Sequence, residues 1–379
     1  MSGDVVVVGG GIVGLACAWR AARRGAAVTV VDPAPGEGAS HAAAGMLAPA
    51  TEVHLARPEH AAFQVAGARR WPAFAEELEA TAGRPVGLRA TGTLVVARDA
   101  DDRAVLDRLV DLQRDLGLDV ERLTRGACRD REPELHPAVA GGVLARDDHQ
   151  VDPRAVVAAL RSALQLDGVV TVRDTVAEVR HDGARVRGVV LTDGGHHPAA
   201  TVVLAAGAAA GRIGGLPGSA RPPVRGVKGQ ILRLRSRDGD PVLTGVVRGL
   251  SRGVPVYLVP RGDGRVVVGA TEEDVGEDRV VTAGGLRALL EAAADLVPAT
   301  DELELQEATA RPRPATPDGA PVIGHAELEG LLLATGHHRG GVLLAPLTAE
   351  AVVDLLEGRA PDPTLAVADP TRPSLHRSS

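Results

Sequence analysis

The chain has 379 residues, 45% of them apolar, yet no apolar run approaches the roughly 20 residues that a membrane-spanning helix needs. Its formal net charge is −7 and its aromatic content is 1%, which disfavours a nucleic-acid binder because such proteins need a basic surface or stacking aromatics. We therefore expect a soluble protein with small-molecule partners and with neither nucleic-acid nor membrane partners. Residues Met1 to Asp4 lack the basic flank of a secretory signal, so we place the chain in the cytoplasm.

The length predicts two domains, or one domain with large excursions, because a single hydrophobic core rarely grows beyond about 250–300 residues. Only two cysteines occur, Cys17 and Cys128, so the sequence favours neither a disulfide framework nor a cysteine-rich metal cluster. The histidine pairs at 196–197 and 337–338 have no metal-ligating company in the sequence, and no metal site is predicted.

The chain opens with a βαβ pattern. Asp4–Val8 is a short apolar run typical of a buried strand, and the Ala/Arg-rich stretch that follows has helical spacing up to Arg24, where Gly25 favours a helix end. A second apolar run, Ala27–Val31, ends at Asp32. Strand, helix and strand in this order predict the start of a parallel sheet.

The rest of the chain leaves simple βαβ repetition. Helical spacing predicts helices over 58–82, 101–116, 154–166, 285–296 and 349–356. Short apolar runs predict strands over 92–97, 169–172, 176–180, 185–191, 201–204 and 331–334. The segment 229–269 alternates β-like runs with Gly, Pro and Asp turns, which predicts an antiparallel sheet. The Pro-rich segment 311–317 is assigned neither helix nor strand, and the tail beyond residue 361 looks loose.

The turn after the first strand carries the dinucleotide fingerprint Gly9-x-Gly11-x-x-Gly14. The first glycine permits a tight turn, the second lets the backbone approach a pyrophosphate, and the third lets helix and strand pack closely. Asp32 stands at the end of the next strand, where an acid meets a ribose hydroxyl, and its charge disfavours NADP. The pattern predicts a dinucleotide site rather than a merely glycine-rich turn, and it leaves NAD and FAD open.

A run of small residues from Gly38 to Pro49 stands where an NAD domain would start another crossover helix. Small residues let the backbone lie against a flat ligand, and a flexible linker would not normally carry Met46-Leu47-Ala48-Pro49. Two later segments, 201–207 and 331–336, each look like a buried strand that runs into a Gly turn and returns the chain to the same sheet.

In this order the motifs resemble the FAD-dependent D-amino-acid oxidase and glycine oxidase family, most closely its glycine oxidases of the thiamine pathway. The resemblance covers nearly the whole chain. It is carried by residues 9–14, 40–49, 227–230, 260 with 268–271, 313–319 and 336–346.

The resemblance implies an α/β fold, α+β overall, in which a discontinuous Rossmann-like FAD-binding domain joins an antiparallel-sheet substrate domain. We assign 1–86, 147–220 and 311–370 to the FAD-binding domain, 87–146 and 221–310 to the substrate domain, and 371–379 to a loose C-terminal tail. The implied cofactor is non-covalent FAD, since some relatives attach the flavin through a late cysteine and no cysteine follows Cys128.

The family also implies which residues contact FAD, with Val176 reaching the adenine side through its backbone and His337–Leu343 wrapping the isoalloxazine end. The expected cofactor contacts are Gly9, Gly11, Ile12, Val13, Gly14, Asp32, Ala39, Ser40, Ala44, Gly45, Met46, Val176, Gly207, His337, His338, Arg339, Gly340, Gly341, Val342 and Leu343.

At the substrate end, a planar guanidinium matches an α-carboxylate because it offers two parallel donors. Arg313 and Arg339 stand where the family has its carboxylate-binding arginine and a second active-site arginine. Arg311 is a rival to Arg313, and the sequence 316–319 that follows favours Arg313. Tyr257 and Met46 are expected to line the substrate cavity, with core packing as the alternative for each.

The resemblance implies oxidative deamination of glycine or another small amine, in which a hydride passes from Cα to flavin N5 and no residue acts as acid or base. With O₂ as acceptor the products are an imine and H₂O₂, and the imine would supply the thiazole of thiamine. The expected partners are therefore a small amino acid, O₂ and the enzymes of thiamine-thiazole synthesis, and a homo-oligomer is left open.

Four alternatives remain at this point. They are a sarcosine or D-amino-acid oxidase, a dehydrogenase of the same fold with an acceptor other than O₂, a non-catalytic FAD subunit, and an NAD-dependent dehydrogenase. The chain departs from the family pattern at His338, Gly340 and Glu272, which leaves the substrate preference open.

Overall fold

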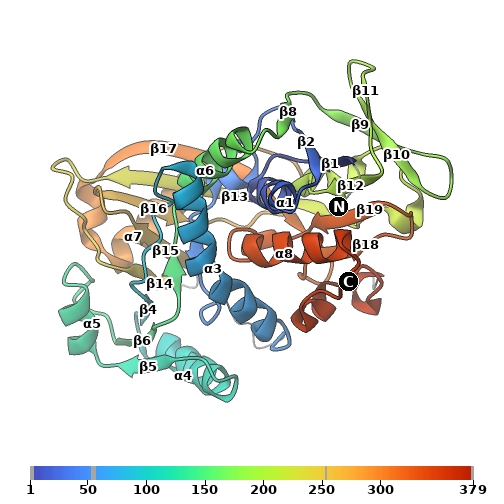
Figure 1. Cartoon of the computed structure of the whole chain (residues 1–379). Coiled ribbons are helices and arrows are strands. Elements are labelled where there is room, and N and C mark those ends of the chain that lie inside the picture. Colours follow the sequence, from blue (N-terminus) through green and yellow to red (C-terminus); the bar gives the residue numbers. More distant parts are fainter. Residues whose placement is uncertain (1–3, 53–56, 252–253, 377–379) are drawn as a thin grey trace.

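The computed structural model describes residues 4–52, 57–251 and 254–376, and two large sheets dominate it (Figure 1). The first sheet has six strands from three separate parts of the chain. Their order is β18 (Val322–His325), β19 (Leu331–Thr335), β12 (Thr201–Leu204), β1 (Asp4–Val8), β2 (Ala27–Val31) and β8 (Val170–Val172). All neighbours are parallel except β18 with β19.

Both faces of the six-stranded sheet are covered, which explains the continuous apolar runs in its strands. Val5 and Val7 of β1 belong to a core shared with four helices, α1 (Ile12–Arg23), α3 (His60–Ala82), α6 (Pro153–Leu166) and α8 (Ala345–Leu356). Val6 and Val8 belong to a second core on the opposite face. That face is covered by a three-stranded antiparallel sheet of β9 (Val176–His181), β10 (Val186–Leu191) and β11 (His196–Pro198).

The second large sheet has eight strands, and only its β14–β4 pair is parallel. Their order is β17 (Glu304–Ala315), β13 (Arg225–Arg235), β16 (Arg265–Gly269), β15 (Val254–Pro260), β14 (Val246–Ser251), β4 (Thr93–Ala97), β6 (Gly141–Ala145) and β5 (Val120–Leu123). Helix α7 (Ala283–Leu296) buries Leu289 and Leu296 in the core of this sheet. Helices α4 (Ala100–Asp115) and α5 (Arg125–Arg131) lie beside β5 and β6.

The predicted fold class is confirmed: a parallel, Rossmann-like sheet is combined with a mostly antiparallel one. The βαβ opening is present, and α6 begins where its sequence predicts. The side chain of Asp152 accepts a hydrogen bond from the Arg154 N–H at 3.0 Å, and Pro153 takes the first helical position. The proposed domain boundaries stay a prediction.

The Pro-rich segment 311–317 needs a correction, because it continues strand β17 up to Ala315. Proline cannot donate to a β-ladder, but β17 is an edge strand whose only strand neighbour in its sheet is β13. An edge strand leaves alternate N–H groups unpaired, so Pro312 and Pro314 fit the positions that point away from β13. Residues 311–315 therefore lie in the eight-stranded sheet, although we assigned them to the FAD-binding domain.

The prediction of a loose tail beyond residue 361 also needs a correction, because residues 362–375 pack on the protein, whereas residues 377–379 of the predicted tail lie outside the described residues. Leu365 and Leu375 are buried. The guanidinium of Arg372 donates to both carboxylate oxygens of Asp318, at 2.7 and 2.9 Å, and the Ser374 hydroxyl adds a third bond at 2.6 Å. The polar composition of this segment suggested a loose tail, because it does not reveal that Arg372 pairs with Asp318, which lies 54 residues away in sequence.

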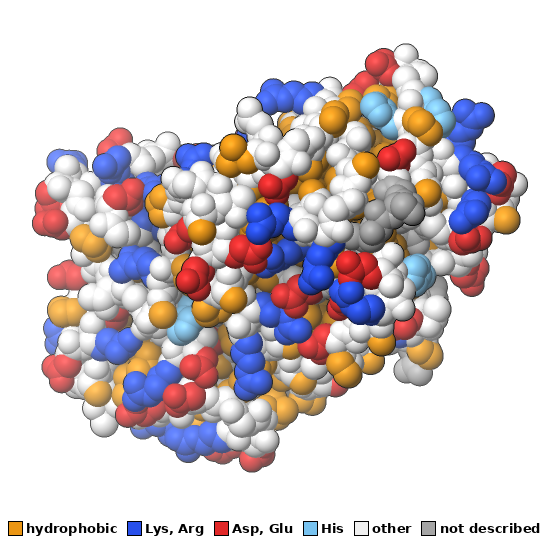
Figure 2. Space-filling view, in the orientation of Figure 1, with side chains coloured by type: hydrophobic (Ala, Val, Ile, Leu, Met, Phe, Trp, Pro, Cys, Tyr) orange, Lys and Arg blue, Asp and Glu red, His pale blue; other side chains and the backbone are white. Residues whose placement is uncertain are grey.

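Positive and negative side chains are interspersed over the face shown in Figure 2. In the part of the chain that the structure describes, we find no helix with the length and apolar character that a bilayer crossing requires.

We expect Arg372→Met to lower the free energy of unfolding by about 3–5 kcal/mol, because it leaves the buried Asp318 carboxylate without its partner. Burial raises the pKa of Asp318, but Arg372 and Ser374 outweigh burial and hold that pKa below its ordinary value. The stabilisation is therefore present above about pH 4 and lost as the pH falls. Urea unfolding at pH 7 and in acid measures both effects.

Arg359→Met is the matched control, since Arg359 forms a surface pair with Asp354 and is 47% exposed. We expect it to change the free energy of unfolding by less than about 1 kcal/mol. Equal effects of the two substitutions would show that the Arg372 pair does not hold the C-terminal segment.

Candidate active site

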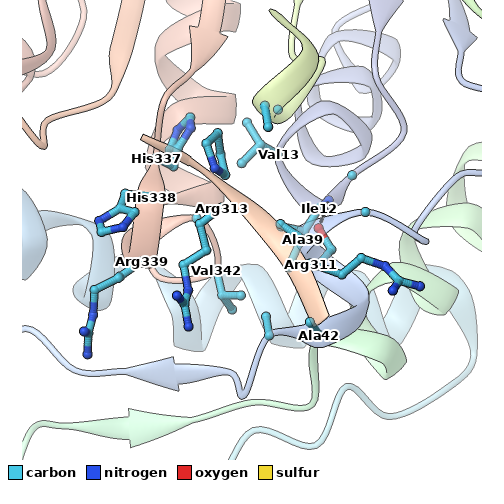
Figure 3. A pocket seen from close by; sticks show the side chains of 18 of the residues that line it. Ile12, Val13, Ala39, Ala42, Arg311, Arg313, His337, His338, Arg339 and Val342 are labelled. Carbon is cyan, nitrogen blue, oxygen red and sulfur yellow. Dashed lines mark hydrogen bonds between the residues drawn. The ribbon is translucent and has the colours of Figure 1, made fainter. Parts of the chain in front are cut away.

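A cavity of about 300 Å³ lies where the two large sheets meet (Figure 3). The turns after β1, β2, β12 and β19 line one end of it, and side chains of β13, β15 and β17 line the other. The carboxyl ends of parallel strands are the usual position of a ligand in such sheets. All the expected cofactor residues except Gly14 and Val176 line this cavity, and so do Arg313 and Tyr257.

The glycine turn brings backbone segments into direct contact. A Cβ on Gly9, whose φ is +114°, would lie 2.3 Å from the carbonyl oxygen of Ala205 in the turn after β12. A Cβ on Gly14 would lie 2.0 Å from the carbonyl oxygen of Gly9, so Gly14 serves the packing of α1 on β1 rather than the cavity surface. The Ile12 N–H at the start of α1 donates to the Ser40 hydroxyl at 2.9 Å. This turn fits a pyrophosphate lying close to backbone.

Asp32 lines the cavity directly after β2. Its carboxylate accepts hydrogen bonds from the Gly10 N–H at 2.7 Å and the Ala34 N–H at 2.8 Å. The side chain thus stabilises the glycine turn itself, in addition to the ribose contact that we expect from it.

The small-residue run forms a wall of the cavity, as its composition suggested. It contains α2 (Ala39–Ala42) and β3 (Met46–Leu47), and β3 pairs with β7 (His149–Gln150). A Cβ on Gly45 would lie 2.0 Å from the Val151 carbonyl oxygen, so only glycine allows this approach. Ala42 and Ala44 pack in one apolar cluster with Tyr257. A flat ligand therefore has backbone and methyl groups to lie against.

Val176 is placed differently from the other expected cofactor residues. It lies on β9 with its side chain buried in the core beneath the six-stranded sheet, and it does not line the cavity. Its contact with the adenine side stays a prediction.

Arg313 and Arg311 both project from β17 into the cavity, in different directions (Figure 3). The Arg313 guanidinium lies over Gly229 of β13, where a Cβ would come within 2.4 Å of its atoms, and it donates to the Thr271 carbonyl at 3.1 Å. Arg311 instead donates to the Glu37 and Ala310 carbonyls, each at 2.9 Å. In the described part of the chain no carboxylate lies within ion-pair distance of Arg313.

Arg339 is already paired, which its sequence position did not indicate. Its Nε lies 3.0 Å from one carboxylate oxygen of Glu52, and its Nη2 donates to the other at 3.2 Å. Glu52 also lies 2.7 Å from Arg248. Burial raises the pKa of Glu52, but the two arginines outweigh burial and lower that pKa to about 2, so Glu52 is ionised. Glu52 lines the cavity, and sequence reasoning missed it because one acid after an apolar run carries no pattern.

The two histidines after β19 are neutral at physiological pH. Burial lowers the pKa of His337 to about 3, and its Nε2 lies 2.9 Å from the Thr348 hydroxyl. Burial also lowers the pKa of His338 to about 4, although Glu272 opposes the shift. Among residues 4–52, 57–251 and 254–376 no group of three metal-ligating side chains is found.

Tyr257 and Met46 both line the cavity and also contribute to the apolar cluster around Ala42 and Ala44. Tyr257 is 8% exposed, and a Cβ on Gly269 would lie 2.4 Å from its hydroxyl oxygen. The two interpretations made from the sequence, cavity wall and core packing, therefore both describe these side chains.

A dinucleotide turn, a backbone wall for a flat ring system and an arginine facing the same cavity define the site of a flavin-dependent oxidoreductase. Residues 4–355 match the DAO family, described as FAD dependent oxidoreductases, and the chain belongs to this family. Its cofactor is FAD, and the residues that we describe fit it.

Within this family the chain is similar to glycine oxidases. It is 36% identical to the glycine oxidase of Geobacillus kaustophilus over 93% of each chain. The crystal structure of glycine oxidase from that organism superimposes with a TM-score of 0.89 over 98% of both chains. The chain is also 36% identical to the bifunctional protein ThiO/ThiG of Synechocystis, covering 97% of this chain and 54% of that protein. Iminodiacetate oxidase from a Chelativorans species has a TM-score of 0.86 and 29% identity, covering 97% of this chain and all of that one.

We expect the FAD to be held without a covalent bond. Both thiols are buried, and burial raises the pKa of Cys17 to about 12 and that of Cys128 to about 11, so neither is a nucleophile at neutral pH. Acid precipitation of the yellow protein should leave the chromophore in the supernatant. A chromophore that remained with the pellet would contradict this expectation.

We expect Asp32→Ala to weaken FAD binding roughly 10- to 150-fold, the equivalent of about 1.5–3 kcal/mol for hydrogen bonds to a charged group. FAD release on dilution of the holoenzyme, followed by flavin fluorescence, measures the effect. Asp193→Ala is the control, because Asp193 makes a similar local bond, to the Gly195 N–H at 2.7 Å, in an exposed turn. FAD affinity unchanged by Asp32→Ala would limit Asp32 to a role in the turn.

Proposed function

We propose that this chain oxidises glycine or another small amino acid with one carboxylate, and that Arg313 binds that carboxylate. The observation that carries the proposal is the placement of the Arg313 guanidinium over Gly229, at the edge of the cavity and without an acidic partner among the described residues. A guanidinium fork that is free of protein carboxylates is suited to a carboxylate brought by the substrate.

The charges around Arg313 support a substrate with a single carboxylate. Arg339 is held by Glu52, which also pairs with Arg248, and Glu272 lies 3.4 Å from Arg339, so two carboxylates face these two arginines. A second acidic group on the substrate would have to compete with Glu52 for Arg339. The departures at His338 and Glu272 lie beside this pair, since Glu272 lies 3.4 Å from Arg339 and 4.0 Å from His338.

Bound FAD supplies the oxidising chemistry by accepting a hydride from the amino acid. The chain's own task is to orient Cα by holding the carboxylate, which removes much of the entropy cost of the reaction. Tyr257, Met46 and the alanines packed with them give this end of the cavity an apolar wall that excludes water. The Cα hydrogen leaves with its electron pair, so no residue needs to remove it as a proton. The His337 Nε2 lies 2.9 Å from the Thr348 hydroxyl, and the pKa of Glu52, about 2, makes that carboxylate a weak base.

We further propose that O₂ is the electron acceptor, giving H₂O₂, and that the imine product supplies the thiazole of thiamine. The similarity to ThiO/ThiG supports this assignment, since nearly the whole of this chain aligns with little more than half of that protein. The remaining part would then correspond to a separate partner enzyme for this chain.

The proposal predicts H₂O₂ release from glycine. Purified holoenzyme should be tested with glycine, sarcosine, D-alanine and iminodiacetate, and glycine should give the highest kcat/KM. Flavin reduction without H₂O₂ release would indicate a different acceptor. A preference for iminodiacetate would contradict the argument from the Glu52–Arg339 pair.

We expect Arg313→Ala to reduce kcat/KM by roughly 30- to 5,000-fold, because losing one partner of a buried charge pair costs about 2–5 kcal/mol. Arg313→Lys should restore little, since an ammonium cannot offer two parallel donors. FAD content should stay normal in both variants. Steady-state kinetics and the flavin absorbance of the purified variants test these expectations.

Arg311→Ala is the control for the register of β17. Arg311 is already bonded to two carbonyls and points away from Arg313, so kcat/KM should stay close to that of the unmodified enzyme. A severe defect in Arg311→Ala together with an active Arg313→Ala would place the carboxylate site two residues earlier on the strand.

A further inference from the structure

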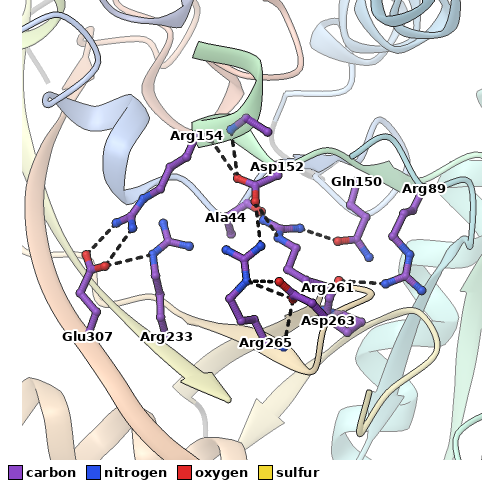
Figure 4. Close-up of polar contacts among 12 residues, drawn as sticks. Ala44, Arg89, Gln150, Asp152, Arg154, Arg233, Arg261, Asp263, Arg265 and Glu307 are labelled. Atoms are coloured by element: carbon purple, nitrogen blue, oxygen red, sulfur yellow. Dashed lines mark hydrogen bonds and ion pairs between the residues drawn. The ribbon is translucent and has the colours of Figure 1, made fainter. Parts of the chain in front are cut away.

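Two buried arginines, Arg233 and Arg261, and the half-buried Arg154 lie behind the cavity wall formed by residues 40–46 (Figure 4). The side chains of Arg233 and Arg261 are only 7% and 6% exposed, and Arg154 contacts the same wall. Burial lowers the pKa of Arg233 and Arg261 to about 10, so both stay cationic at neutral pH. None of the three lines the cavity itself. Because burying a guanidinium is costly, the bonds that these side chains make must account for their position.

All three arginines donate to backbone carbonyls of the cavity wall. Arg261 Nη2 donates to the Ala44 carbonyl at 2.6 Å. The His41 carbonyl receives two donors, Arg233 Nη2 at 2.8 Å and Arg154 Nε at 3.0 Å. The Ala44 carbonyl therefore accepts from one arginine, whereas the His41 carbonyl accepts from two, so loss of Arg233 would leave His41 with one donor.

The arginines are themselves fixed by other side chains. Arg261 Nη1 donates to the Gln150 side-chain oxygen at 2.5 Å, and its Nε lies 3.9 Å from Asp152. Arg154 Nη2 and Nη1 donate hydrogen bonds to the two carboxylate oxygens of Glu307 on β17, at 2.7 and 2.9 Å. The cluster thus ties the wall to α6 on one side and to the eight-stranded sheet on the other.

Holding these carbonyls also sets the direction of the N–H groups in the wall. In a trans peptide the C=O and N–H of one unit point in opposite directions. The Ala44 carbonyl points to Arg261, so the Gly45 N–H points away from Arg261 and toward the cavity that Gly45 lines. Among the described residues the Gly45 N–H has no acceptor. The carbonyl of Gly45 itself is occupied by the Val151 N–H at 2.8 Å.

We propose that Arg261, and to a smaller degree Arg233, are positioning residues for the cofactor: they hold the wall carbonyls outward and so present backbone N–H donors to bound FAD. The cationic cluster behind the wall also favours the negative charge that the flavin gains on reduction. This inference concerns FAD alone and does not rest on the identity of the amino-acid substrate.

The test compares Arg261→Met, Arg233→Met and Arg265→Met in the holoenzyme. FAD release on dilution, measured by flavin fluorescence, should show an affinity about 10- to 100-fold weaker for Arg261→Met, a smaller loss for Arg233→Met, and none for Arg265→Met. Arg265 is the matched control, because it joins the same cluster through Asp152 and Asp263 but bonds no wall carbonyl. At saturating FAD, the reduction potential of Arg261→Met should be more negative and its flavin spectrum shifted.

A purely structural role would lower the melting temperature of Arg261→Met and leave FAD affinity, spectrum and potential unchanged, which would overturn the proposal. Equal losses in Arg261→Met and Arg265→Met would overturn it as well, because only the cluster charge would then matter. Arg261→Lys covers the case in which Arg261→Met does not fold. It keeps the charge but not the fork, so FAD binding should weaken about 3- to 10-fold, and full affinity would contradict the role of the fork.

Discussion

The backbone contact between Gly9 and Gly14 decides where the rest of the active site lies. With a carbonyl oxygen at 2.0 Å from a Cβ on Gly14 and at 2.3 Å from one on Gly9, β1, α1 and the turn after β12 meet without any side chain between them. This approach brings the positive end of α1 to the surface of the cavity. Asp32 bonds the same turn from β2, so three neighbouring strands of the parallel sheet contribute to one binding surface.

The run of small residues after β2 links the two large sheets through hydrogen bonds and forms a wall of the cavity between them. Its first half is held by arginines that stand on β13, β15–β16 and α6, and Gly45 lies directly against Val151. Its continuation is held by Asp148, which accepts bonds from the Ala50 and Thr51 N–H groups at 2.8 and 2.9 Å. The next residue is Glu52. The backbone that faces the cofactor and the carboxylate that binds Arg339 are therefore placed by one continuous, anchored segment.

Electrostatics then distinguishes Arg313, expected from the sequence to bind the carboxylate, from Arg339, expected to be a second active-site arginine. Arg339 lies against an ionised, partly buried carboxylate, and this pairing raises its pKa further above the ordinary value. Among the described residues, the Arg313 guanidinium has a single hydrogen-bond partner, the Thr271 carbonyl at 3.1 Å. A charge in a cavity needs a counter-charge or water. A substrate carboxylate therefore gains the most binding free energy beside the Arg313 guanidinium.

The sequence by itself determined the features that depend on local order: the βαβ opening, the fingerprint with Asp32, the helix start at Asp152 and the small-residue wall. Each of these is written in consecutive residues whose conformational preferences and spacing act over a few positions. Only the tertiary structure decided the pairing of Arg339 with Glu52, the anchoring of Arg372 on Asp318 and the arginines behind Ala44, whose partners lie 287, 54 and 217 residues apart. Ion pairs and buried donors leave no periodic pattern in a sequence, because their energy depends on burial and distance, and these are set when distant strands are brought together.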